Sequence, residues 1–230
     1  MSQTTTDSSG GGERQIKSRE RVAKHGEVFT NPREVNAMLD LVRPETERPE
    51  SRFLEPACGN GNFLVAILER KLAVVGARHR LRSDFELYAL ISVSSLYGIE
   101  LLMDNVEECR ERLYDVFRSH YAERYEADDE SDFLRSVRHV IHHNIVCGDA
   151  LTLMSPDGSR PVAFAEWSCI GDSKIKRRDF TLDMLLKNQP IEEPNLFSDL
   201  GEEAFIPMPF REFPPIHYLK LHTQDDTEQF

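Results

Sequence analysis

The sequence predicts an α/β fold in which a parallel sheet carries helices on both faces. Short apolar segments that indicate buried strands alternate with longer helical patterns, an order that is typical of parallel sheets. The strand signals lie at residues 53–55, 97–100 and 144–147. Acidic residues stand at or just beyond the ends of these segments, as Glu55, Glu100 and Asp149. Because ligands bind beyond the carboxyl ends of the strands in such sheets, the pattern predicts a ligand site there.

The composition fits a globular protein. With 230 residues, the chain is long enough for one domain with a sizeable core and short extensions. No apolar run approaches the roughly 18 residues of a membrane-spanning helix, and the first residues contain no apolar signal segment. We therefore expect a cytoplasmic protein without a membrane partner. The four cysteines lack C-x-x-C spacing, which favours reduced thiols over a metal site or a disulfide framework.

The sequence divides into three parts. Residues 1–24 are expected to form a flexible, basic N-terminal arm, in which the solvated start of a helix is favoured over contact with nucleic acid. The basic residues of this segment are Arg14, Lys17, Arg19, Arg21 and Lys24. Residues 25–188 form the folded domain. Residues 189–230 form a Pro-rich, acidic tail, which we expect to be extended and to wrap the domain or dock a partner.

The first element of the domain is a helix that begins near Pro32. Thr30 or Asn31 can cap it, and proline is favoured at the first helical position. Apolar residues at helical spacing then predict a buried face made of Val35, Met38, Leu39 and Val42.

Residues 53–68 have the pattern of a strand, a tight loop and a helix, and the domain is organised around them. The loop contains Gly59 and Gly61, and apolar residues from Phe63 onward predict a helix over residues 63–75. Glycines allow the backbone to turn sharply and to approach a ligand closely. No lysine follows the glycines and Glu55 precedes them, so a cationic or ammonium-bearing ligand fits better than a phosphate.

Four short motifs resemble those of one enzyme family. EPACGNGNF at residues 55–63 resembles motif I of S-adenosylmethionine-dependent DNA methyltransferases, especially the adenine-N6 modification subunits of restriction–modification systems. HGEVFTNP at residues 25–32 resembles motif X, with one additional Asn before the proline. YGIEL at residues 97–101 resembles motif II, and GDAL at residues 148–151 resembles motif III. This gamma-type order implies a Rossmann-like class I methyltransferase sheet with S-adenosyl-L-methionine (SAM) as the cofactor.

The resemblance also implies the cofactor-binding residues. Glu55 and the glycine turn correspond to the part that holds the methionine end of SAM, Glu100 to the acid on the ribose hydroxyls, and Asp149 to the acid on the adenine amino group. The full set is Phe29, Thr30, Glu55, Pro56, Ala57, Gly59, Gly61, Phe63, Glu100, Leu101, Asp149 and Ala150. No metal is implied.

The spacing between motifs I and II predicts an inserted helix. The number of residues between Gly61 and Glu100 is about twice the roughly 20 residues that typically separate the glycine loop from the acidic residue in dinucleotide-binding proteins. Residues 84–96 have a matching apolar pattern. A helix over residues 104–118 follows, with Asp104 or Asn105 as its cap, and the charged segment 119–135 is expected to be an exposed loop or a frayed helix.

The catalytic motif of the family, Asn/Asp-Pro-Pro-Tyr/Phe, is not recognisable at residues 160–175, where it is expected. In the family this motif accepts hydrogen bonds from the target amine and stacks on a flipped base. Residues 162–178 instead predict a hairpin that turns at 171–173 and leads to a helix over residues 181–187. The prolines at residues 207–215 lack the pattern as well, so the catalytic residues stay unassigned.

Two groups in the predicted hairpin have alternative interpretations. Trp167 and Glu166 suit a substitute acceptor pocket, but a core tryptophan beside a solvent-facing acid is favoured. A basic cluster suits phosphate contacts and the protection of a sheet edge equally well. Its members are Lys174, Lys176, Arg177 and Arg178.

The resemblance implies a SAM-dependent methyltransferase of the DNA adenine-N6 type. The alternative is a catalytically incomplete SAM-binding subunit that acts with a partner protein; an enzyme for RNA or a small molecule is a weaker third. The net charge of −12 leaves three interpretations open: a partner subunit grips the DNA, basic groups cluster locally, or the substrate is not DNA. The implied partners are DNA, reached through a partner subunit, and a restriction or specificity subunit.

Overall fold

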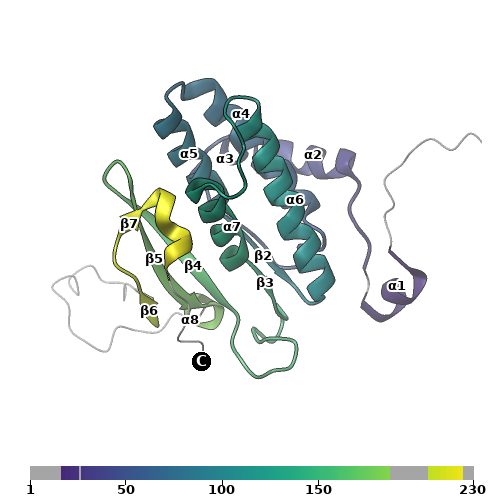
Figure 1. Cartoon of the computed structure of the whole chain (residues 1–230). Helices are drawn as coiled ribbons and strands as arrows, with labels where there is room; N and C mark the ends of the chain where they lie inside the picture. Colours follow the sequence, from purple (N-terminus) through teal and green to yellow (C-terminus); the bar gives the residue numbers. More distant parts are fainter. Residues whose placement is uncertain (1–16, 26, 187–206, 225–230) are drawn as a thin grey trace, which may run out of the picture.

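The computed structural model describes residues 17–25, 27–186 and 207–224 (Figure 1). At its centre lies a three-stranded parallel sheet in which β2 is the middle strand. The strands are β1 (Phe53–Glu55), β2 (Leu96–Glu100) and β3 (Ile145–Cys147). Leu54 pairs with Tyr97, and Ile99 pairs with Val146. The predicted mixed α/β fold with a parallel sheet is therefore confirmed, and the three strands end at the same edge.

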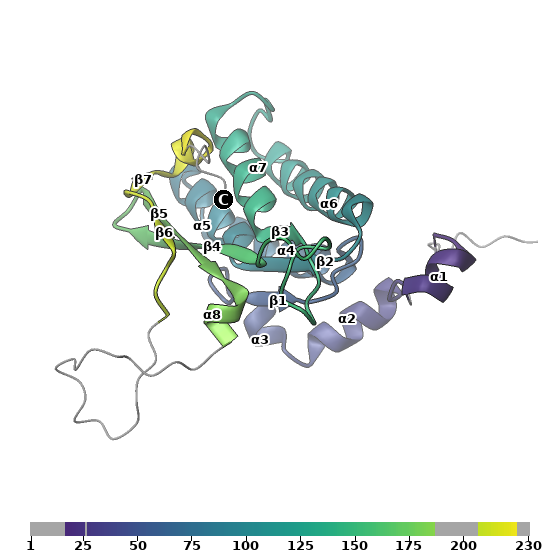
Figure 2. The same ribbon diagram turned by 90° about the horizontal axis from the view of Figure 1, so that it is seen from below.

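Four long helices connect the parallel strands and pack together on one face of the sheet (Figures 1 and 2). They are α4 (Asn62–Arg78), α5 (Arg82–Ser94), α6 (Met103–Ala122) and α7 (Asp132–Asn144). The inserted helix predicted before β2 is confirmed as α5. It ends earlier than predicted, at Ser94, because Leu96 already pairs with Phe53 in the sheet.

The loop predicted over residues 119–135 is wrong at both ends. Helix α6 continues to Ala122, and α7 begins at Asp132 with Ser131 as its N-cap residue. Tyr121 and Phe133 are buried, and their ring centroids lie 5.3 Å apart. The acidic residues of this segment therefore flank two helix ends whose aromatic side chains belong to the core.

The start of β4 (Ala163–Ile170) and the short helix α8 (Leu182–Leu186) cover part of the other face of the parallel sheet. The rest of the hairpin that β4 forms with β5 (Lys174–Thr181) packs beside helices α5 and α7. Phe164 packs edge-on against Tyr97, and Val162 and Ile99 belong to the same small apolar cluster. The predicted hairpin is confirmed. The expected layer of long helices on this face is absent from the described residues, where the short helix α8 and the start of β4 lie instead.

The C-terminal segment adds to the antiparallel sheet. Strands β6 (Arg211–Glu212) and β7 (Ile216–His217) both pair with β5, and the 3₁₀ helix η2 (Tyr218–Thr223) follows. Strand β5 is therefore an inner strand, and its basic cluster does not protect a sheet edge. The extended character predicted for the tail is confirmed at β6 and β7, whereas η2 was not predicted. Tyr218 and Leu221 are buried, so the tail contributes to the core. Residues 189–206 and 225–230 of the predicted tail lie outside the described residues.

Three short helices precede the sheet: α1 (Arg19–His25), α2 (Pro32–Asp40) and α3 (Arg43–Thr46). Asn31 is the N-cap residue of α2, and its side chain accepts a hydrogen bond of 2.9 Å from the backbone N–H of Arg33. The predicted cap is thus confirmed. Of the predicted apolar face, Val35 and Leu39 are buried, whereas Met38 and Val42 are exposed.

Membrane-spanning helices and metal sites are both missing from the described part of the chain. None of its helices combines the length and apolar character needed to cross a membrane. The same residues contain no group of three or more His, Cys, Asp or Glu side chains placed to hold a metal ion.

Candidate ligand site at the carboxyl edge of the parallel sheet

The loop between β1 and α4 makes two left-handed turns that only glycine accommodates well. Gly59 has φ +53° and Gly61 has φ +89°. A Cβ atom at position 61 would lie 2.6 Å from Sγ of Cys109, and one at position 59 would lie 3.1 Å from the Phe29 ring. Both the backbone conformation and the close approach of neighbours therefore require these glycines.

Hydrogen bonds anchor this loop to β2 and α6. The backbone N–H of Cys58 donates to the carbonyl of Ile99 at 2.9 Å. Arg112 donates to the carbonyl of Asn60 at 2.8 Å and to the side chain of Asn62 at 2.7 Å. The loop is consequently a fixed cradle whose shape is set from β2 and α6.

Glu100, at the end of β2, braces the same loop. Its carboxylate accepts hydrogen bonds from the backbone N–H of Gly59 at 2.9 Å and of Leu102 at 3.0 Å. Leu102 is the N-cap residue of α6, so the predicted cap at Asp104 or Asn105 is wrong. The side chain of Asn105 also donates to Oε1 of Glu100 at 3.4 Å. Since a carboxylate has about four acceptor sites, Glu100 retains about one for a ligand.

Burial in the loop shifts the pKa values of Glu55 and Cys58. Partial burial raises the pKa of Glu55, although a hydrogen bond from the backbone of Ala57 acts in the opposite direction. The pKa of the Cys58 thiol is raised by a hydrogen bond with Cys109 and by burial. Both cysteines are buried, free thiols.

The segment that resembles motif X lies directly against the glycine loop. The ring of Phe29 contacts Gly59, and the side chain of Asn62 donates a 2.9 Å hydrogen bond to the carbonyl of Thr30. The structure thus brings together Phe29, Thr30 and the loop, which are far apart in the sequence.

Glu27 is a site residue that the sequence interpretation missed. Its side chain is 7% exposed, and Oε2 accepts hydrogen bonds from Arg21 at 2.6 Å and from Asn105 at 3.4 Å. Its second oxygen, Oε1, is buried without a hydrogen-bond partner, as is Oδ1 of Asn60 in the loop. Buried acceptors of this kind need donors, and both lie next to groups that hold the cradle. Only its position two residues before Phe29 could have indicated Glu27.

The basic arm pairs with the start of α6. Lys17 forms ion pairs with Glu108 at 2.5 Å and Asp104 at 3.3 Å, and Arg21 reaches Asp104 at 2.6 Å. The hydrogen bond from Arg21 is the main reason that the pKa of Asp104 falls to about 2. The predicted helix is present as α1, and these two cations bind the protein's own carboxylates.

The third strand contributes Asp149, two residues beyond its end. Oδ1 of Asp149 accepts a 2.8 Å hydrogen bond from the backbone N–H of Leu151 and stabilises the following turn. The other predicted positions lie along the same edge with varied exposure. Pro56, Ala57 and Leu101 are exposed, whereas Phe63, Glu100, Asp149 and Ala150 are partly buried. The predicted residues therefore gather at the ends of the three parallel strands.

Trp167 and Glu166 lie away from this edge. The indole N–H of Trp167 donates to Asn144, which directly precedes β3, and Glu166 pairs with Arg52, which directly precedes β1. Both therefore sit near the amino ends of the strands, at the opposite end of the sheet from the glycine loop. The favoured interpretation of a core tryptophan is confirmed, because its side chain is buried.

The basic cluster on β5 is engaged within the antiparallel sheet. Arg177 is buried and pairs with Asp179 at 2.8 Å, and Arg178 pairs with Glu166 at 2.6 Å. Lys176 pairs with Glu212 of β6. Ion pairs within the antiparallel sheet thus account for three of the four cations.

Comparisons of the chain with protein-family models, with curated proteins and with solved structures gave no match.

Proposed function

We propose that the protein binds SAM at the carboxyl edge of its parallel sheet and is the cofactor-binding subunit of a methyltransferase that modifies adenine N6 in DNA. The observation that carries the proposal is the convergence of the glycine loop with carboxylates from three separate segments, Glu27, Glu55 and Glu100. Such an acidic, backbone-lined cradle suits a ligand that carries positive charge and several hydrogen-bond donors.

The residues present fit SAM in these terms. Its ammonium group and ribose hydroxyls are donors, and Oε1 of Glu27 and Oδ1 of Asn60 are buried acceptors without partners. Glu55 lies at the end of β1, where a carboxylate offsets the charge of an ammonium or sulfonium group. When bound, SAM supplies an electrophilic methyl group.

The chain's own residues position and shield that ligand. Glu100 and Arg112 fix the backbone of the loop, and Phe29 covers Gly59 with an apolar ring. A prearranged cradle needs little reorganisation on binding, and this favours correct orientation of the reacting group.

Two observations support a subunit over a self-sufficient enzyme. Within the described residues, β1 pairs with β2 alone, and the chain after β3 forms an antiparallel hairpin of a separate sheet instead of a fourth parallel strand. Trp167 and Glu166, the best substitutes for an acceptor site, lie near the opposite edge. A partner that supplies the acceptor-binding loop therefore completes the proposed activity.

Cofactor binding can be tested with a matched pair of variants. Glu55→Ala should weaken SAM binding about ten- to hundredfold, because a charge-assisted hydrogen bond contributes about 1.5–3 kcal/mol. Glu69→Ala removes the same charge from an exposed position of α4 and should bind like wild type. Isothermal titration calorimetry gives the affinities, and circular dichroism checks the fold. Equal binding by both variants would disprove the site.

Transfer of labelled methyl groups from SAM to unmethylated duplex DNA distinguishes the two versions of the function. Purified protein alone should bind SAM and transfer nothing above the Glu55→Ala background. Transfer by the protein alone would instead establish a self-sufficient enzyme and refute the subunit proposal.

A further inference from the structure

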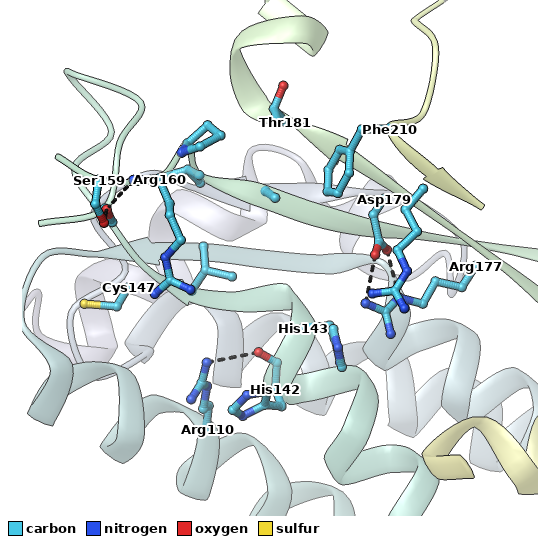
Figure 3. A pocket seen from close by; sticks show the side chains of 16 residues that line it. Arg110, His142, His143, Cys147, Ser159, Arg160, Arg177, Asp179, Thr181 and Phe210 are labelled. Carbon is cyan, nitrogen blue, oxygen red and sulfur yellow. Dashed lines mark hydrogen bonds and ion pairs between the residues drawn. The ribbon is translucent and has the colours of Figure 1, made fainter. Parts of the chain in front are cut away.

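A cavity of about 1010 Å³ lies beside β3, between helices α6 and α7 and the β4–β5 hairpin (Figure 3). Its lining is basic although the whole chain carries a net charge of −12. Among the described residues, four arginines and a single acid line it: Arg110, Arg160, Arg177, Arg211 and Asp179. Arg177 pairs with Asp179 inside the sheet, whereas Arg110 and Arg160 form no ion pair within the described residues.

Arg110 reaches the cavity from α6. Its guanidinium donates to the carbonyl of Ile145 at 2.6 and 2.9 Å and to that of His142 at 3.0 Å. It forms no ion pair with a carboxylate of the described residues. Partial burial lowers its pKa, yet a guanidinium stays protonated in proteins. A fixed positive charge without an ion-pair partner among the described residues therefore lines the β3 side of the cavity.

Arg160 enters from the loop before β4. Asp157, the nearest acid along this loop, accepts hydrogen bonds from the hydroxyl groups of Ser155 and Ser159 and makes no ion pair with Arg160 within the described residues. The side chain of Arg160 extends down toward the wall that carries Arg110 (Figure 3). Two cations from separate elements thus face a shared space, an arrangement that an anion between them stabilises.

The rest of the lining combines aliphatic side chains with aromatic rings, of which that of Phe210 lies on the far side of the cavity beside Asp179 (Figure 3). Val146, Pro161 and Val162 line the cavity from β3 and the hairpin, and the rings of His142 and Phe210 line it from α7 and from the segment before β6. Guanidinium groups that neutralise phosphates, combined with rings on which bases stack, are the features of single-strand nucleic-acid sites. We propose that this cavity binds a single nucleic-acid strand, with its phosphates at Arg110 and Arg160.

The cavity is larger than a small anion alone would fill and has room for a nucleotide of a strand. Its volume is at the upper end of the roughly 300–1,000 Å³ range of small-molecule pockets. The proposal goes beyond SAM binding and uses none of the residues of the glycine-loop site. Its test needs no SAM, so the failure of either proposal is distinguishable from the failure of the other.

The test is fluorescence anisotropy of fluorescein-labelled oligothymidylate titrated with the full chain at low salt and at rising potassium chloride. The Arg110→Gln/Arg160→Gln variant should bind the oligonucleotide at least about tenfold more weakly than wild type. The slope of log affinity against log salt concentration should be shallower by about 1–2. The control Arg78→Gln/Arg80→Gln removes the same charge from exposed positions near the end of α4 and should match wild type. Since Arg110 also holds Ile145, the single variant Arg160→Gln serves as a check that leaves those hydrogen bonds in place.

Loss of binding in the double and Arg160→Gln variants, with the control unchanged, supports the proposal. Three outcomes overturn it. Wild type binds no oligonucleotide at low salt; the cavity and control variants weaken binding equally; or adenosine monophosphate binds in a manner that depends on Arg160 while the oligonucleotide does not.

Discussion

Single residues set the shape of the loop between β1 and α4, and Gly61 does so in two ways at once. Its positive φ is unfavourable for any residue with a Cβ, and its neighbour Cys109 leaves no room for one. Gly171 shares the positive φ, with φ +66°, but a Cβ atom added there would meet nothing within 4 Å. Comparing Gly61 with Gly171 therefore separates the cost of backbone strain from the cost of a steric conflict with a neighbour.

Gly61→Ala should therefore lower the free energy of unfolding by about 2–5 kcal/mol, as the sum of backbone strain and overpacking. Gly171→Ala should cost only about 1 kcal/mol, from the backbone alone. Urea denaturation followed by circular dichroism measures both. Similar losses for the two variants would show that Cys109 moves aside at little cost.

The buried environment of Lys71 changes the pKa of its amine. It is fully buried, and its amine donates to the carbonyls of Pro49 and Ser51 and to the hydroxyl of Ser95. Burial lowers its pKa from 10.5 to about 7, although Glu50 and Glu45 act in the opposite direction.

Between pH 7 and about 10.5, the unfolded chain binds a proton at Lys71 that the folded protein does not bind. The free energy of unfolding should consequently rise with pH across this window. The contribution is isolated by subtracting the same pH series for Lys71→Met, since the other titrating groups are shared. A flat or falling difference between the two proteins would contradict the lowered pKa.

At the scale of elements, helices and strands with regular apolar spacing were predictable from the sequence, and elements that depend on tertiary packing were not. The helix after the glycine loop and the β4–β5 hairpin follow from helical and alternating spacing, and both are present. Helix α7 was missed because its apolar positions follow a run of acids, although Phe133, Val137 and Val140 do share one buried face. The 3₁₀ helix η2 has too few residues for a period and depends on packing against α7.

That packing gives a test of the tail. Leu221 of η2 is fully buried, whereas Met208 at the start of the same segment is 77% exposed. Leu221→Ala should reduce the free energy of unfolding by about 2–5 kcal/mol, and Met208→Ala by less than about 0.5 kcal/mol. Chemical denaturation of both variants is sufficient. A negligible effect at Leu221 would mean that the tail is not part of the cooperative core.

At the scale of the whole molecule, the sequence predicted which residues meet at the sheet edge better than what surrounds them. Glu55, Gly59 and Glu100 were identified because strand ends in a parallel sheet converge. Glu27 and the basic cavity were not, since a buried unpaired oxygen and a shared space between Arg110 and Arg160 exist only after the chain has folded. The same reasoning explains the net charge: an overall sum of −12 conceals a local surplus of the opposite sign.

The order of the parallel strands also bears on how the protein folds. Phe53 pairs with Leu96 and Gly98 pairs with Ile145, so each pairing closes a long loop, whereas Ile170 meets Lys174 across a tight turn. Non-local pairings form slowly because the entropy of loop closure is lost before contacts compensate for it. The hairpin and the helices are therefore expected to form early and the glycine loop late. A chain still leaving the ribosome has no finished ligand cradle until β2 and α6 have emerged.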